Sequence, residues 1–115
     1  MMNTKLKPIL PSLREKKRYL VFEVISKEKI SDFEHVANEI QHCSLQFLGK
    51  LGAAKAGIIP LANKWNESLQ RGIMKVSHKH VDAAKASLMF TNNDIIFRSL
   101  GVSGILKKAE SKFLR

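Results

Sequence analysis

A run of mostly apolar residues with few polar ones, RYLVFEVIS, extends from Arg18 to Ser26 and divides between two faces in the manner of a strand. Leu20, Phe22 and Val24 would lie on one face of a strand, and the opposite face is mostly apolar as well. Alternation with period two predicts a β-strand, because successive side chains of a strand point to opposite faces. Apolar residues on both faces predict that this strand is central in its sheet.

The apolar spacing becomes helical after Ser31, which stands three residues before Glu34 and predicts a capping box. The residues that follow at helical spacing are Phe33, Val36, Ala37, Ile40, Ser44, Phe47, Leu48 and Leu51. This helix is expected to end near Gly49 or Gly52. Cys43, the only cysteine of the chain, falls on the apolar stripe and is predicted to be a small core residue.

A pair of strands is predicted next. The segment AKAGIIPLANKW, residues 54–65, is interpreted as a strand that contains Pro60. Because proline cannot donate a hydrogen bond to a neighbouring strand, this strand is placed at a sheet edge. A turn at 66–70 then leads to a partner strand, RGIMKVS, at 71–77.

The remaining elements are a helix, a strand and a terminal helix. The second helix is expected to begin at Ser77 or His78 and to close at Asn92 or Asn93, and its inward positions are Val81, Ala84 and Leu88. The last strand, DIIFRSLGV, covers 94–102. It leads through a turn from Gly101 to Gly104 into the terminal helix.

This order of elements is typical of a split βαβ unit repeated once. It predicts an α+β fold of the ferredoxin-like or RRM-like kind, a four-stranded antiparallel sheet with helices on one face and an extra C-terminal helix. In that topology the second strand is an edge strand, which agrees with Pro60. The 115 residues are divided into a basic N-terminal segment, 1–18, and a single α+β domain, 19–115.

The net charge of +10 is concentrated at the two ends of the chain. Residues 1–18 have a net charge of +5 and residues 98–115 have +4, whereas the long middle contributes only +1. Two basic ends that converge would form one positive surface, which favours a polyanionic partner. The alternative is that both ends are merely solvated.

The sequence favours an intracellular, cytoplasmic protein that does not bind membranes. No run approaches the eighteen apolar residues of a transmembrane helix, and the N-terminal segment, broken by Pro8 and Pro11, does not resemble a secretion signal. A single cysteine cannot form an intramolecular disulfide, which fits a reducing compartment.

No catalytic or metal-binding residues are predicted. The segment after the first strand, SKEKIS, lacks the glycine and arginine of acylphosphatase-like enzymes, and Cys43 alone cannot form a thiolate metal site. His78 and His80 would point in different directions on a helix and are interpreted as surface histidines. The sequence contains no phosphate-binding loop and no catalytic Ser, His and Asp set.

Base stacking on the sheet is also disfavoured. The strand RGIMKVS has Ile73 and Lys75 where an RNA recognition motif places aromatic side chains. Tyr19 and Phe22 cannot form that platform by themselves. If the partner is RNA, the contacts are therefore expected to be with its phosphates and its shape, made by the basic ends.

The terminal helix has an apolar arc and a basic arc. Ile105, Leu106, Ala109 and Phe113 form the arc predicted to dock, whereas Lys107, Lys108, Lys112 and Arg115 form the arc predicted to face outward. Gly101 and Gly104 would permit the preceding turn, and Ser103 would cap the helix, whose N-terminus favours an anion. The segment GVSG alone is more typical of an ordinary turn, but beside the lysines it predicts a place for phosphate.

The two end segments carry a family resemblance. Residues 11–26, PSLREKKRYLVFEVIS, and residues 98–114, RSLGVSGILKKAESKFL, resemble the archaeal ribonuclease P protein component 2 family. The resemblance implies an accessory subunit, not an enzyme on its own, that supports the catalytic RNA as it removes the 5′ leader from precursor tRNA. It implies magnesium held with the RNA and no cofactor held by the protein. The implied partners are ribonuclease P RNA, protein component 3, precursor tRNA through the holoenzyme, and a second copy within a heterotetramer.

The residues expected to contact RNA, or to shape that contact, follow from the basic ends and the two matching segments. They are Arg14, Lys16, Lys17, Arg18, Arg98, Gly101, Ser103, Gly104, Lys107, Lys108, Lys112 and Arg115. The main alternative is a general structured-RNA-binding or ribosome-associated domain. A protein-interaction module that meets an acidic protein is a third hypothesis.

Overall fold

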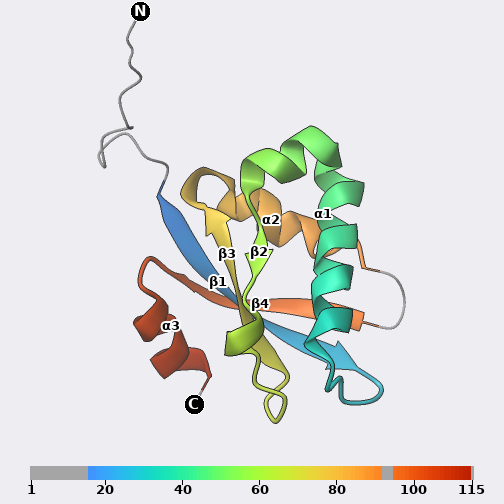
Figure 1. Cartoon of the computed structure of the whole chain (residues 1–115), viewed down its shortest axis with the longest axis vertical. Coiled ribbons are helices and arrows are strands. Elements are labelled where there is room, and N and C mark those ends of the chain that lie inside the picture. Colours follow the sequence, from blue (N-terminus) through green and yellow to red (C-terminus); the bar gives the residue numbers. More distant parts are fainter. Residues whose placement is uncertain (1–15, 92–94, 115) are drawn as a thin grey trace, which may run out of the picture.

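The structure, a computed structural model, describes residues 16–91 and 95–114. Its strands form one antiparallel sheet in the order β2-β3-β1-β4 (Figure 1). The elements are β1 (Lys17–Ser26), α1 (Phe33–Ala56), β2 (Ile59–Pro60), η2 (Ala62–Lys64), β3 (Arg71–Ser77), η3 (His78–His80), α2 (Val81–Ser87), β4 (Ile95–Ser103) and α3 (Leu106–Phe113). The predicted α+β fold, a ferredoxin-like arrangement with an additional C-terminal helix, is confirmed.

The first strand is central, as its pattern predicts. β1 pairs with β3 on one side and with β4 on the other, both antiparallel. Leu20, Val21 and Phe22 are completely buried, although they alternate between the two faces. Both faces of this strand are therefore covered by other parts of the chain.

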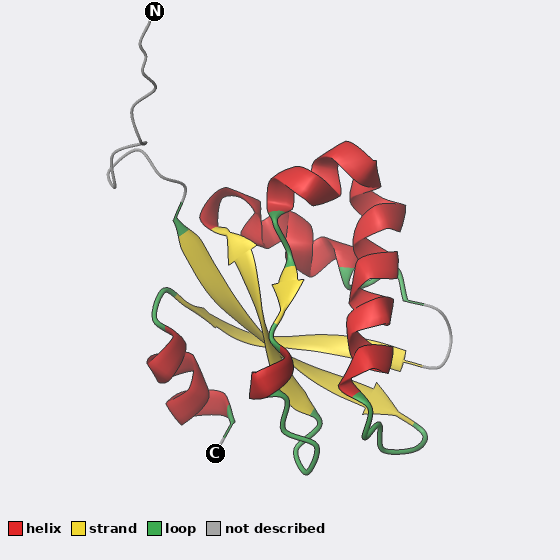
Figure 2. Ribbon diagram, in the orientation of Figure 1, coloured by secondary structure: helices red, strands yellow, loops and turns green. Residues whose placement is uncertain are grey.

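Helices cover the two faces of the sheet differently (Figure 2). α1 and α2 pack on one face, where Val36 and Ile40 of α1 meet Phe22 of β1 in the larger core. α3 packs on the opposite face, where Ala109 meets Val21 and Ile73 in a smaller core. The expectation of helices on one face thus holds for α1 and α2, and α3 covers part of the second face.

The second strand lies at the sheet edge, as Pro60 predicts, but it is much shorter than expected. β2 contains only Ile59 and Pro60, so the predicted strand over 54–65 is wrong. Residues 54–56 belong to α1, and Ala62–Lys64 form a 3-10 helix. The apolar residues of this segment pack in the two cores instead, because Ile58 is buried in the larger core and Leu61 packs against the smaller one.

The boundaries of α1 also differ from the prediction. Its N-cap is Asp32 and not Ser31, because the Asp32 carboxylate accepts a hydrogen bond of 2.9 Å from the backbone N–H of Glu34. The helix does not end at Gly49 or Gly52. Gly49 has non-helical angles, φ 74° and ψ 175°, which bend the helix, and the helical path then continues to Ala56. A left-handed residue, Gly57, ends it.

The later elements follow the prediction more closely. β3 covers 71–77 as expected, and in the second helical segment Ala84 and Leu88 are buried. This segment begins with η3 at His78 and continues as α2, which ends at Ser87. The predicted extension of α2 to Asn92 or Asn93 is therefore wrong, and those two residues lie outside the described chain. Within the described ranges, no helix is both long enough and apolar enough to cross a membrane.

Candidate nucleic-acid interface

The start of β1 and the end of β4 lie side by side, which brings the two basic ends of the chain together. Because the two strands are antiparallel, Tyr19 pairs with Ser103. A Cβ placed on Gly104 would lie 3.6 Å from Nη1 of Arg18, so the Arg18 guanidinium lies beside the turn that precedes α3. The predicted convergence is confirmed for these described residues.

The basic arc of α3 faces outward, as predicted. Lys107, Lys108 and Lys112 are exposed, whereas Ala109 is completely buried against the sheet. The three lysines and Ser111 line a shallow depression. The Nζ of Lys112 lies 5.6 Å from the ring centroid of Phe113, a distance at which an ammonium group is attracted to an aromatic face. These lysines form a compact positive surface directly after Gly104.

The turn before α3 differs in detail from the prediction. Gly101 is not part of the turn but of β4, and a Cβ on it would lie only 2.4 Å from the ring of Phe113. Ser103 is not the N-cap of α3. The N-cap is Ile105, which makes no side-chain cap, and the Ser103 hydroxyl accepts a hydrogen bond of 3.1 Å from the N–H of Ile105. Gly101 therefore allows α3 to pack closely, while Ser103 orders the turn.

The other predicted residues are more scattered. Lys16 and Lys17 are exposed, but Lys17 points toward the end of α1, since its Nζ would lie 3.5 Å from a Cβ on Gly57. Arg98 is five residues before Ser103 along β4, about 16 Å away for an extended chain. The structure therefore does not bring Arg98 into the surface around Gly104. Arg14 and Arg115 lie outside the described residues.

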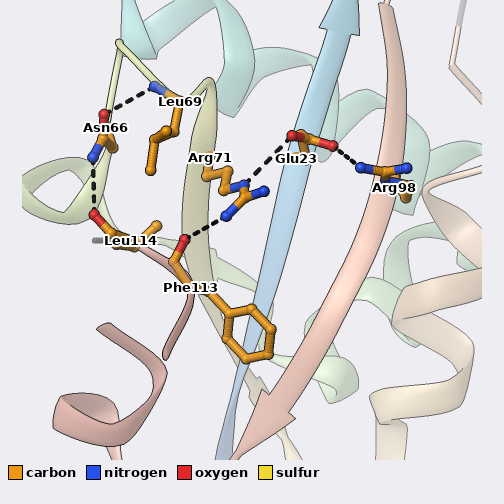
Figure 3. A network of polar contacts seen from close by, with 7 residues as sticks. All are labelled: Glu23, Asn66, Leu69, Arg71, Arg98, Phe113 and Leu114. Atoms are coloured by element: carbon orange, nitrogen blue, oxygen red, sulfur yellow. Dashed lines mark hydrogen bonds and ion pairs between the residues drawn. The ribbon is translucent and has the colours of Figure 1, made fainter. Parts of the chain in front are cut away.

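Arg98 belongs to a separate polar network (Figure 3). Its guanidinium forms an ion pair with Oε1 of Glu23, and the other carboxylate oxygen of Glu23 lies 3.4 Å from Nε of Arg71. The Arg98 side chain remains 59% exposed, so it is accessible to solvent although it is paired. Lys64 and Glu110 form a further ion pair of 2.9 Å that joins η2 to α3.

One cation near this surface is missed by the sequence analysis. Lys75 of β3 pairs with Tyr19, which in turn pairs with Ser103 on the other side. Directly opposite residues of antiparallel strands share a face, so Lys75 lies in the same row as the end of β4. Only the register of the strands reveals this neighbour, because Lys75 is distant from both basic ends in the sequence.

The described residues offer no alternative site of obvious chemistry. Within them, no group of three or more His, Cys, Asp or Glu side chains could hold a metal ion. Nδ1 of His78 lies 3.1 Å from the carbonyl oxygen of Lys16, and Nδ1 of His80 lies 3.3 Å from the Ser77 hydroxyl. Both residues are partly exposed at the surface, as predicted.

Cys43 is a core residue, as predicted, and it is completely buried. Its burial, together with the nearby charge of Glu39, raises the pKa of its thiol to about 11. Since the thiolate is the reactive form of cysteine, the thiol is inert at neutral pH.

Comparisons of the sequence with known proteins find similarity to one group. The model of the Rpp14/Pop5 family matches residues 18–114. The chain is 39% identical to "Ribonuclease P protein component 2" of Thermococcus kodakarensis, covering 98% of this chain and 95% of that protein. Proteins with the same name from Pyrococcus abyssi and Methanocaldococcus jannaschii are 38% and 36% identical, over 96% and 95% of this chain and 94% and 81% of their own lengths.

Proposed function

Because the chain belongs to the Rpp14/Pop5 family, we propose that it is a protein subunit of ribonuclease P that supports the catalytic RNA in removing the 5′ leader from precursor tRNA. The observation that carries this proposal is the similarity over nearly the whole chain to proteins named for ribonuclease P. A general RNA-binding or ribosome-associated role is not favoured, because the names of these relatives refer to one specific complex, ribonuclease P.

The proposed physical role is to place fixed positive charges beside crowded phosphates. An RNA that folds into a compact core brings phosphates together, and cations held by a protein lower their mutual repulsion. The surface formed by Arg18, Gly104 and the α3 lysines supplies such charges next to a helix that packs on the sheet. In this proposal the RNA with its magnesium ions performs the hydrolysis, and the protein stabilises the active arrangement.

The partners follow from the same proposal. We propose that the subunit contacts ribonuclease P RNA directly, works with protein component 3, and meets precursor tRNA through the holoenzyme. A second copy of the chain within a heterotetramer is part of this proposal.

The proposal is tested by recovering a tagged full-length chain from its native host at moderate salt. The bound RNA is sequenced, the bound proteins are identified, and the material is assayed for cleavage of precursor tRNA. We expect one dominant structured RNA together with 5′-processing activity that is lost after treatment with a ribonuclease. A broad mixture of RNAs, or protein partners without RNA, would contradict the proposed function.

A further inference from the structure

The basic surface depends on a very short helix. α3 has only eight residues, and an isolated helix of this length is not stable in water. Its place on the molecule must therefore come from contacts with the sheet. Ala109 is fully buried there, and the Phe113 ring lies over Gly101, so one face of α3 is held by apolar packing.

The C-terminal end of α3 is held by polar contacts from outside the helix (Figure 3). Nη1 of Arg71 donates a hydrogen bond of 3.0 Å to the carbonyl oxygen of Phe113. Nδ2 of Asn66 donates another of 3.0 Å to the carbonyl oxygen of Leu114. The last carbonyls of a helix have no partner within it and carry partial negative charge. A cation and an amide donor at this end are therefore stabilising.

Both donors are fixed in turn by other parts of the chain. Arg71 is held from its opposite side by the Glu23 carboxylate, only 19% exposed, at 3.4 Å from Nε. Oδ1 of Asn66 accepts a hydrogen bond of 3.0 Å from the N–H of Leu69. Arg71 thus joins the central strand β1, its own strand β3 and the end of α3. No other side chain in the described ranges makes polar contacts that join these three elements.

We infer that Arg71 is a positioning residue, which fixes the end of α3 and thereby aims Lys107, Lys108 and Lys112 at RNA phosphates without touching the RNA itself. This inference rests on the proposed function. If the end of α3 could fray, binding would first have to order it, and that ordering would reduce the affinity. The guanidinium suits this role because its separate N–H groups can bind a carboxylate and a carbonyl at once.

The first test uses the full-length chain without RNA. Arg71→Gln removes the charge and the bridging geometry but keeps a side chain of moderate length. We expect the amide proton of Leu114, which is hydrogen-bonded to the Glu110 carbonyl oxygen in the last turn of α3, to exchange with solvent on the order of tenfold faster, with exchange in β1 unchanged. Lys85→Gln, an exposed position on α2, removes the same charge and should leave both unchanged. Unchanged exchange in α3 of Arg71→Gln would overturn the positioning role.

The second test separates positioning from direct contact. Binding of ribonuclease P RNA is measured at low salt for Arg71→Gln, for the triple change of Lys107, Lys108 and Lys112 to Ala, and for the two combined. A positioning residue acts through the lysines, so its loss should weaken binding on the order of tenfold alone but less than about twofold when the lysines are absent. If Arg71→Gln weakens binding as much without the lysines as with them, Arg71 binds phosphate itself, and the inference is overturned.

Conservative variants complete the design. Arg71→Lys keeps the charge but cannot bridge the carboxylate and the carbonyl in the same way. The RNA affinity of this variant should therefore remain below that of the unmodified chain, and a full recovery of affinity would contradict positioning. Asn66→Ala removes the second contact on α3 without changing any charge and should show the same pattern more weakly. If the unmodified chain fails to bind the RNA, the proposed function fails, whereas an unchanged α3 in the exchange experiment refutes the positioning role alone.

Discussion

Gly101 and Gly104 look equivalent in the sequence, but only Gly101 lies under an aromatic ring. A Cβ on Gly101 would approach the Phe113 ring to 2.4 Å, whereas a Cβ on Gly104 would meet its nearest neighbour, the Arg18 guanidinium, at 3.6 Å. We predict that Gly101→Ala lowers the free energy of unfolding by about 1–3 kcal/mol, because the ring and α3 must shift. Urea denaturation measures this loss.

The matched control at the residue scale is Gly104→Ala, which should change the free energy of unfolding by less than about 0.5 kcal/mol at this exposed position. Gly101→Ala combined with Phe113→Leu should recover part of the loss, since the smaller side chain relieves the contact. Equal midpoints for Gly101→Ala and the unmodified chain would contradict the packing of Phe113 on β4.

The different roles of the two glycines could not be predicted from local sequence. The segment GVSG is typical of a turn, and this indicates correctly that a turn precedes α3. Whether Gly101 belongs to that turn or to the strand depends on where Phe113, twelve residues later, returns to the sheet. Contacts of this range arise from the docking of α3 and leave no local pattern.

At the scale of elements, the start of α1 gives a direct test. The Asp32 carboxylate caps this helix, whereas Ser31, at the position predicted for the cap, does not. We predict that Asp32→Ala lowers the free energy of unfolding by about 1 kcal/mol and that Ser31→Ala has little effect. Thermal unfolding of both variants measures the difference. The reverse order of effects would restore Ser31 as the cap.

The strands were more predictable than the helix ends. The period-two pattern predicts β1, the bounds predicted for β3 are those observed, and Pro60 correctly identifies the edge strand. The failure lies between Gly49 and Ile59, where Gly49 and Gly52 suggest a helix end that occurs only at Gly57. Gly49 instead bends α1, and the helix then resumes through an alanine-rich segment, 53–56, with good helix propensity. In the local sequence, a glycine that bends a helix cannot be distinguished from a glycine that ends one.

At the scale of the whole molecule, the candidate surface was predictable only as far as the topology was. A sheet in which the first and last strands are neighbours brings the start of β1 to the end of β4, and this places Arg18 beside Gly104. The same topology removes Arg98 from that surface and adds Lys75, because position along a strand decides which residues become neighbours. Net charge at the chain ends carries no information on that position.

The α3 lysines give the prediction that concerns the whole complex. Replacing Lys107, Lys108 and Lys112 by Ala should make the dependence of RNA affinity on salt shallower, by about two to three units of log–log slope, since each phosphate contact releases close to one counterion. The magnesium concentration needed for cleavage of precursor tRNA should rise, because magnesium must then screen the phosphates that the lysines no longer neutralise. Circular dichroism should show an intact fold, since all three side chains are exposed.

The decisive control changes the same net charge elsewhere. Lys29, Lys50 and Lys85 are exposed in the loop after β1, on α1 and on α2, so their triple replacement by Ala removes three charges from parts of the chain away from α3 and from the start of β1. If the surface after Gly104 binds the RNA, this second variant keeps most of the original slope and magnesium requirement, because screening confines exposed charges to neighbours within about 10 Å. Equal effects of the two triple variants would assign the affinity to net charge alone and would refute a localised phosphate-binding surface on α3.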